Sequence, residues 1–176
     1  RASATAEIIF EDCFVPDSAR VGKEGRGFMI AMQTLQMSRP VVAAISVGIA
    51  QAAIEAAVAY SHHRKQFGVK IATFEMVQQM IADMVMKTEA ARILTYKACV
   101  AQMNKDKKAG LYSAMSKCFA SDTAMEVTTT AVQVMGGNGY SRENPVEKYM
   151  RDAKIMQIYE GTNQVQRLVI ANEATF

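Results

Sequence analysis

Residues 39–57, RPVVAAISVGIAQAAIEAA, decide the fold class. The stretch is rich in alanine, which has the highest helix propensity of all residues. The helical pattern starts upstream near Gly27 and continues to about His63, so we predict one long helix here. Pro40 lies inside the pattern and is expected to kink or restart the helix, because proline lacks the backbone N–H donor.

Further helices are predicted downstream, after Gly68 ends the first one. Two long helices are expected over about 74–103 and 107–135, the second stopped by two glycines at 136–137. Two short helices, about 145–155 and 162–173, finish the chain. Long helices with short connections favour an antiparallel arrangement, so the predicted fold is all-α: an antiparallel four-helix-bundle domain with short extra helices.

The first 22 residues have a different character. Ile8–Phe10 is a β-rich run, and Pro16-Asp17 is typical of a turn. A lone hairpin cannot bury its own face, so we expect a short β remnant of a sheet whose other strands are absent. The chain is therefore divided into residues 1–22, from a β-domain, and residues 23–176, the helical bundle. We expect it to be a domain of a longer protein.

Composition excludes several classes of function. The 176 residues carry a formal net charge of +3 with acids and bases interspersed, so no nucleic-acid partner is expected. The three cysteines form no CxxC pair, which fits an intracellular protein without disulfides or zinc. Gln51 and Glu55 interrupt the longest apolar run, so no membrane span is predicted. His62 and His63 point roughly 100° apart on a helix and cannot share a metal as i,i+4 ligands do.

The stretch IYEGTNQ, residues 158–164, places a carboxylate where a solvated loop acid would also be ordinary. Glu160 follows mostly apolar residues, so the loop is expected to be packed. Burial raises the pKa of a carboxylic acid, which can then act as a general base near neutral pH. Thr162 is the expected N-cap of the last helix.

Two other stretches have both a structural and a ligand-binding interpretation. MGGNGY, residues 135–140, follows a helix rather than a strand and has GGxG spacing, which excludes a Rossmann fingerprint. It can be a helix C-cap, yet three glycines also let a ligand approach the backbone. HRKQFG, residues 63–68, can place favourable charge at a helix end, or offer a cation and a ring to a nucleotide. Arg39, beside Pro40, is either a surface charge or a paired buried cation.

Taken together in this order, four stretches resemble the C-terminal half of acyl-CoA dehydrogenases. They are RPVVAAISVGIAQAA (39–53), HRKQFG (63–68), VQVMGGNGY (132–140) and PVEKYMRDAKIMQIYEGTNQVQRL (145–168). The resemblance covers essentially the whole chain. It implies an FAD-dependent α,β-dehydrogenation of an acyl-CoA thioester to the trans-2-enoyl-CoA, in the medium- and short-chain-like branch. A glutamate takes the α-proton in this family, while the β-hydrogen leaves as hydride to flavin N5.

The resemblance also assigns residues. Glu160 matches the catalytic base, and Ser38 stands at the position that carries the base in a minority branch. The implied FAD-binding residues are Arg64, Gln66, Phe67, Gln133, Val134, Met135, Gly136, Gly137, Thr162 and Gln164, the first eight of them toward the cofactor of a neighbouring subunit. The implied substrate-binding residues are Arg39, Tyr159 and Gly161. Gln36, Glu75 and Asn172 depart from the family pattern and bear on the recognition of CoA.

The implied partners are an acyl-CoA substrate, an electron-transferring flavoprotein as acceptor, and further copies of the chain in a dimer or tetramer. The implied location is a bacterial cytoplasm or a mitochondrial matrix. Two alternatives stay open: an acyl-CoA oxidase of the same fold, and a non-catalytic helical association domain. The isolated chain is expected to be inactive, because the domains that complete the flavin and acyl sites are missing.

Overall fold

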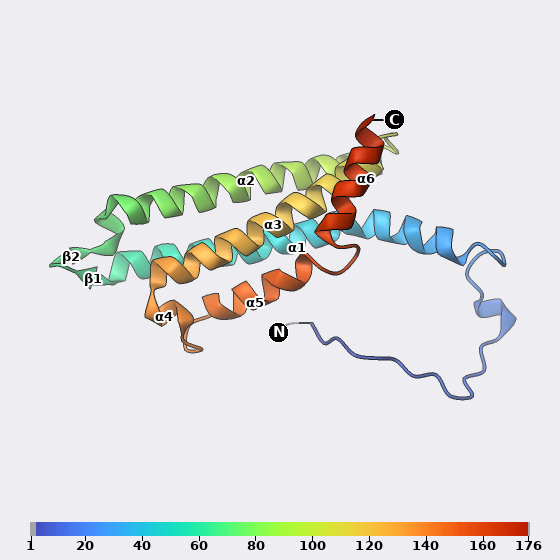
Figure 1. Cartoon of the computed structure of the whole chain (residues 1–176), viewed down its shortest axis with the longest axis horizontal. Helices are drawn as coiled ribbons and strands as arrows, with labels where there is room; N and C mark the ends of the chain where they lie inside the picture. The colour runs from blue at the N-terminus through green and yellow to red at the C-terminus, as the bar shows by residue number, and fades with distance from the viewer. Residues whose placement is uncertain (1–2, 176) are drawn as a thin grey trace.

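The computed structural model describes residues 3–175, and most of them are helical (Figure 1). Three long helices form the body of the bundle: α1 (Gly27–His63), α2 (Glu75–Met103) and α3 (Ala109–Met135). The single turn α4 (Gly137–Tyr140) follows, and then α5 (Val146–Met156) and α6 (Asn163–Thr175). The predicted all-α helical bundle is confirmed, and α4 is the helix that the sequence did not predict.

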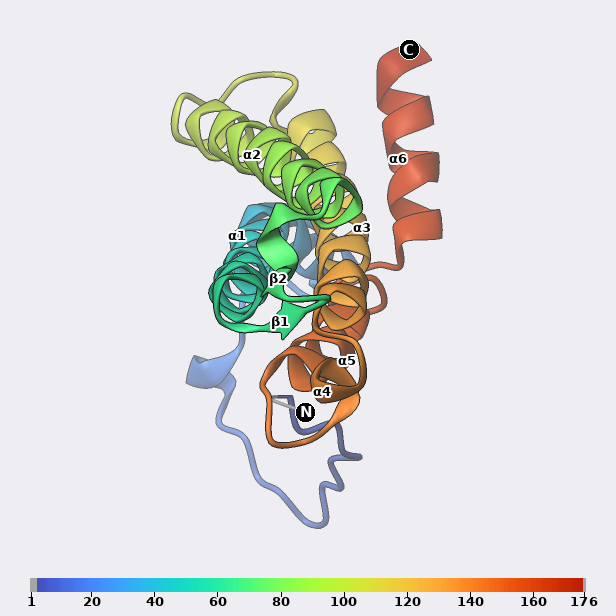
Figure 2. The ribbon, with the colours of Figure 1, turned by 90° about the vertical axis from the view of Figure 1, so that its left-hand side faces the viewer.

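Helix α3 is the centre of the bundle, because α1, α2, α5 and α6 all pack against it. Seen end-on, it lies between α2 and α5 (Figure 2). The core contains many alanines, which allow close approach of the helices. The fully buried ones in the main cluster include Ala53, Ala57, Ala124 and Ala131, with Met84 and Val127 as larger members.

Pro40 does not restart α1, which runs through it as a single helix. In a regular helix the N–H of residue 40 would donate to the carbonyl of Gln36, and proline cannot do this. Gln102 of α2 supplies the missing donor. Its Nε2 donates to the backbone carbonyl oxygen of Gln36 at 2.7 Å and to Ser113 Oγ at 2.9 Å. A side chain from the neighbouring helix therefore compensates for the proline.

A two-residue hairpin, which the sequence did not predict, joins α1 to α2. Strands β1 (Lys65–Gln66) and β2 (Val69–Lys70) pair antiparallel. Phe67 and Gly68 form the turn with φ of 52° and 80°, the backbone that two-residue hairpins favour. The predicted role of Gly68 was wrong, since α1 already ends at His63 and the glycine serves the turn.

The predicted strand at Ile8–Phe10 is not formed. These side chains are exposed, and within residues 3–26 the only regular element is a 3-10 turn at Asp17–Ala19. A strand needs the hydrogen bonds of a paired strand, which no described residue provides to this segment. The segment loops away from the bundle in Figure 1.

Helix α1 is long and apolar enough to cross a membrane by length and composition, with a mean hydropathy of 1.9 in its most apolar window. A buried core helix meets the same criterion. Here α1 packs against α2, α3 and α5, and it contributes Ala50, Ala53 and Ala57 to the core. These contacts favour a core helix.

Candidate functional site

The loop between α5 and α6 carries Glu160 on an unusual backbone. Glu160 has φ of 56° and Gly161 has φ of 87°, so two consecutive residues adopt the left-handed conformation. A non-glycine residue rarely adopts it, and such strain persists only where surrounding contacts fix the chain. The turn directs the half-buried Glu160 side chain to α1, where Ser38 Oγ donates a hydrogen bond to the carboxylate.

Arg39, the next residue on α1, is buried, with only 8% of its surface exposed. Burial lowers the pKa of its guanidinium, while the nearby carboxylates of Glu173 and Glu160 raise it. Among the described residues, its Nε finds no hydrogen-bond partner. A buried donor without a partner is costly, so Arg39 is an unsatisfied cation next to the Ser38–Glu160 contact.

The residues on either side of Glu160 and Gly161 have structural contacts of their own. Thr162 is the N-cap of α6, as predicted: the N–H of Val165 donates to its Oγ1 at 3.3 Å. Gln164 is exposed on the first turn of that helix. The hydroxyl of Tyr159 donates to Met156 Sδ at 2.9 Å, and burial raises the pKa of Tyr159.

A second cluster forms at the far end of α3, where it meets the hairpin and α4. We call it the glycine groove, a hollow of about 440 Å³. It brings together Arg64, Gln66, Gln133, Val134, Met135, Gly136 and Gly137, and it is also lined by Tyr60, Ile71, Phe74, Val77 and Asn138. Seven residues that the resemblance assigned to one cofactor site therefore share one groove.

The glycines keep the floor of the glycine groove open. Gly136 has φ of 60° and ψ of −140°, a conformation that is essentially restricted to glycine. No heavy atom lies within 4 Å of where a Cβ would stand on Gly136 or Gly137. Because these two residues have no side chain, a ligand can approach their backbone directly.

Of the eight residues that the resemblance assigned to the cofactor of a neighbouring subunit, Phe67 is the one that lies outside the glycine groove. It is at the tip of the hairpin and is 94% exposed. Its ring meets Phe74 edge to face, with centroids 6.3 Å apart.

The two clusters lie apart on the molecule. The glycine groove is at the end of α3 beside β1, β2 and α4, whereas the Glu160 loop follows α5 and leads into α6 (Figure 1). Lys117 contacts the loop and Met135 lines the groove, so at a rise of 1.5 Å per residue the two are separated by about 27 Å along α3.

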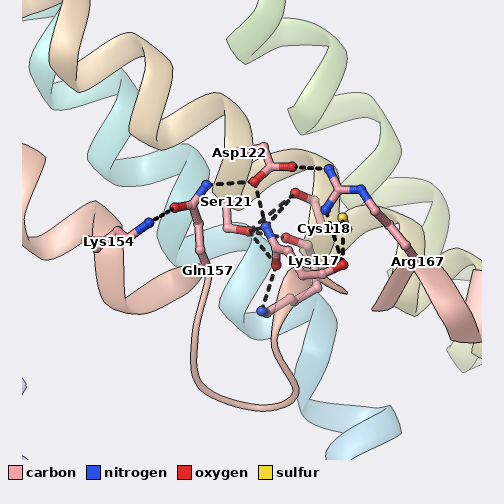
Figure 3. A network of polar contacts seen from close by, with 8 residues as sticks. Lys117, Cys118, Ser121, Asp122, Lys154, Gln157 and Arg167 are labelled. Carbon is pink, nitrogen blue, oxygen red and sulfur yellow. Dashed lines mark hydrogen bonds and ion pairs between the residues drawn. The ribbon is translucent and has the colours of Figure 1, made fainter. Parts of the chain in front are cut away.

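A partly buried polar network between the Glu160 loop and α3 was not predicted from the sequence (Figure 3). Its members are Lys117, Ser121 and Asp122 of α3, Gln157 at the start of the loop, and Asn163 and Arg167 of α6. A signal did exist. Lys117 lies on the same helical stripe as Ala114, Ser121 and Ala124, all fully buried, so a lysine interrupts a face of small residues.

The family model for the C-terminal domain of acyl-CoA dehydrogenases matches residues 25–175. The chain belongs to the acyl-CoA dehydrogenase family.

Relatives of this acyl-CoA dehydrogenase domain agree. The chain is 54% identical to the probable acyl-CoA dehydrogenase FadE25 of Mycobacterium tuberculosis, over 97% of this chain and 44% of the relative. It is 47% identical to the mouse mitochondrial short-chain specific acyl-CoA dehydrogenase, over 97% of this chain and 41% of the relative. The solved structure of butyryl-CoA dehydrogenase from Megasphaera elsdenii superposes with a TM-score of 0.92 at 49% identity. The match covers 96% of this chain and 44% of that one. The chain thus spans less than half the length of these acyl-CoA dehydrogenases.

Proposed function

We propose that the chain is the C-terminal helical part of a longer, FAD-dependent acyl-CoA dehydrogenase, and that residues 1–22 belong to a β-domain that precedes it. The reaction is the removal of the α-proton and the β-hydrogen of an acyl-CoA thioester. The observation that carries the proposal is the Glu160 carboxylate, held by Ser38 on a strained turn beside the unpaired donor of Arg39.

In this proposal Glu160 accepts the α-proton of the substrate. A base must lie within hydrogen-bond reach of the proton that it removes, and the turn at residues 160–161 fixes where the carboxylate stands. Its bond from Ser38 limits rotation of the side chain. Arg39 is assigned to the CoA moiety, because it matches a CoA-contacting residue of the family and its guanidinium is a cation close to Glu160. Tyr159 and Gly161 are assigned to the region around the acyl group.

The FAD site is proposed in two parts. Arg64, Gln66 and the backbone of residues 133–137 line the glycine groove and would hold one cofactor, with exposed Phe67 near it. Thr162 and Gln164 would hold another, beside Glu160. The open floor at Gly136 and Gly137 and the cation of Arg64 fit a pyrophosphate. When bound, FAD would accept the β-hydrogen as hydride.

The separation of the two clusters supports a homo-oligomer in which each FAD is shared by two subunits. Exposed apolar side chains give a second reason. Phe28, Met37 and Val41 on α1 remain uncovered in the single chain, and burying such surface is favourable. A neighbouring subunit or the proposed β-domain would cover them.

The names of the relatives favour a dehydrogenase over an oxidase, and therefore an electron-transferring flavoprotein over oxygen as acceptor. The butyryl-CoA and short-chain relatives favour a short acyl group. Relatives from a bacterium and from mitochondria support an intracellular location. A non-catalytic association domain would need neither the Glu160–Ser38 contact nor the open glycine groove.

Replacing the base tests the proposed function. In the complete enzyme, Glu160→Gln should reduce turnover of a short acyl-CoA by roughly 10²-fold or more, because the amide cannot accept the proton. Turnover is measured with an artificial electron acceptor, and flavin absorbance measures the FAD content, which should not change. The matched control is Glu143→Gln, at an exposed carboxylate, which should leave turnover unchanged. Full activity in Glu160→Gln would show that the base is elsewhere.

A further inference from the structure

Lys117 is an unusual residue in the core of the bundle. It lies in the middle of α3 and is 0% exposed, whereas lysines are almost never fully buried unless paired. Its Nζ donates to the carbonyl oxygen of Gly161 at 2.8 Å and to Oδ1 of Asn163 at 2.9 Å. Among the described residues it forms no ion pair, so both of its acceptors are neutral oxygens of the Glu160 loop and its helix.

Burying an ammonium group against neutral acceptors is costly, because burial disfavours the charged form. Burial accordingly lowers the pKa of Lys117 to about 8. The charges that act on it come from Cys118 and Asp122 on α3, Arg39 on α1, and Glu160 in the loop. A methionine would fill similar space without that cost. The lysine is therefore explained by what its hydrogen bonds hold.

The bonds hold the strained turn. The carbonyl of Gly161 also accepts from Gln166 Nε2 at 3.0 Å, and the same nitrogen lies 3.2 Å from the carbonyl oxygen of Glu160. Gln166 is itself fully buried. Of these two buried side chains, Lys117 of α3 thus binds the Gly161 carbonyl, and Gln166 of α6 binds the carbonyls of both left-handed residues.

The two ends of the loop are fixed to α3 as well, through Asp122. Gln157 at the start of the loop donates to Asp122 Oδ1 at 2.7 Å, and so does the side chain of Asn163 at its end. The backbone N–H of Asn163 donates to the Gln157 carbonyl at 3.0 Å, which closes the loop. Figure 3 shows these contacts converging on the side of α3 that faces the loop.

We propose that Lys117 is a positioning residue: its buried ammonium group holds the Gly161 carbonyl and the Asn163 side chain, and thereby fixes the Glu160 carboxylate against the substrate. The inference rests on the proposed function, because it assigns Glu160 as the base. Lys117 itself does not touch the reacting atoms.

The decisive variant is Lys117→Met in the complete enzyme, because it removes the ammonium group, with its donors and charge, but keeps an unbranched side chain that fills the space of the lysine stem. Displacing a catalytic group by about 1 Å can cost up to about 10²-fold in rate, so we expect kcat to fall by roughly 10-fold or more with little change in KM. The isotope effect with α-deuterated acyl-CoA should increase, because proton removal becomes rate-limiting.

The matched control is Val127→Ala, a buried change on the same helix that loosens the core away from the loop. It should change neither the isotope effect nor kcat. If Lys117→Met gives the same isotope effect as the wild type, Lys117 only contributes to stability and the inference is wrong.

The wild-type enzyme provides a test that needs no variant to fold. The charge-assisted bonds weaken as Lys117 loses its proton, so the α-deuterium isotope effect should increase as pH rises through about 8. An isotope effect that stays constant from about pH 7 to 9.5 would overturn the inference.

Hydrogen exchange separates this inference from the proposed function. In the complete protein, Lys117→Met should increase amide exchange in residues 158–163 at least several-fold, while the core of α2 stays protected. Faster exchange in residues 158–163 is expected even if Glu160 is not the base. In that case Lys117 still positions the loop, and only its role in catalysis is refuted. Unchanged exchange in this loop would refute the positioning role directly.

Discussion

At the scale of single residues, the left-handed pair Glu160–Gly161 is the most constrained feature of the candidate site. Glycine is required at 161 for two reasons, its φ of 87° and the lack of space around it. A Cβ there would stand 2.5 Å from Gln166 Nε2, one of the atoms that hold the turn. The residue after the base therefore determines where the base can stand.

We expect Gly161→Ala to lower the free energy of unfolding by about 1–3 kcal/mol, because the backbone is strained and Gln166 must move. Gly48→Ala is the control: Gly48 lies in the middle of α1 with nothing near its Cβ position. The Gly48→Ala change should raise the free energy of unfolding by about 0.5–1 kcal/mol, because alanine has a higher helix propensity than glycine. Urea denaturation of both variants measures the difference, and equal effects at the two positions would contradict the strain argument.

At the scale of elements, α1 and α2 depend on each other at Pro40. The proline leaves the Gln36 carbonyl without its helical donor, and Gln102 of α2 provides one. The long helix is continuous through Pro40 because of a contact from a helix that comes about sixty residues later in the chain. The expected restart of the helix at Pro40 therefore does not occur, whereas the predicted end near His63 is confirmed.

A double-mutant cycle tests this dependence. Gln102→Ala should lower the free energy of unfolding by about 1–3 kcal/mol, since it leaves a partly buried carbonyl unsatisfied. In a Pro40→Ala background the alanine N–H can bond to Gln36, so the same Gln102→Ala change should cost clearly less. Additive effects would show that the two residues act independently.

At the scale of the whole molecule, the buried lysine makes stability depend on pH. Lys117 has a pKa of about 8 in the folded state, against an ordinary value of 10.5. Between these values the unfolded chain binds more protons than the folded one, so this residue adds stability as pH rises from about 8 to about 10.5.

We expect the free energy of unfolding of the wild type to increase relative to Lys117→Met over that window, as measured by urea denaturation at each pH. Comparing the two proteins cancels the titrating groups that do not interact with Lys117. Burial raises the pKa of Cys118, which lowers stability at high pH, and because Lys117 acts on this thiol, the comparison is repeated in a Cys118→Ala background. A constant difference from pH 7 to 10.5 would show that Lys117 does not titrate as proposed.

The sequence by itself determined the helical class, the approximate limits of the long helices, the stop at Gly136–Gly137 and the cap at Thr162. These features depend on local propensity, on glycine and on capping, which act over a few residues. The motifs also determined the family.

Only the tertiary structure decided the rest. It placed Arg64, Gln66 and residues 133–137 in one groove, brought Ser38 to Glu160, and put Lys117 and Asp122 beneath the loop. It also left Ile8–Phe10 without a strand. Each of these outcomes depends on a partner far away in the chain, and such a partner is set by how the helices pack and not by local preference.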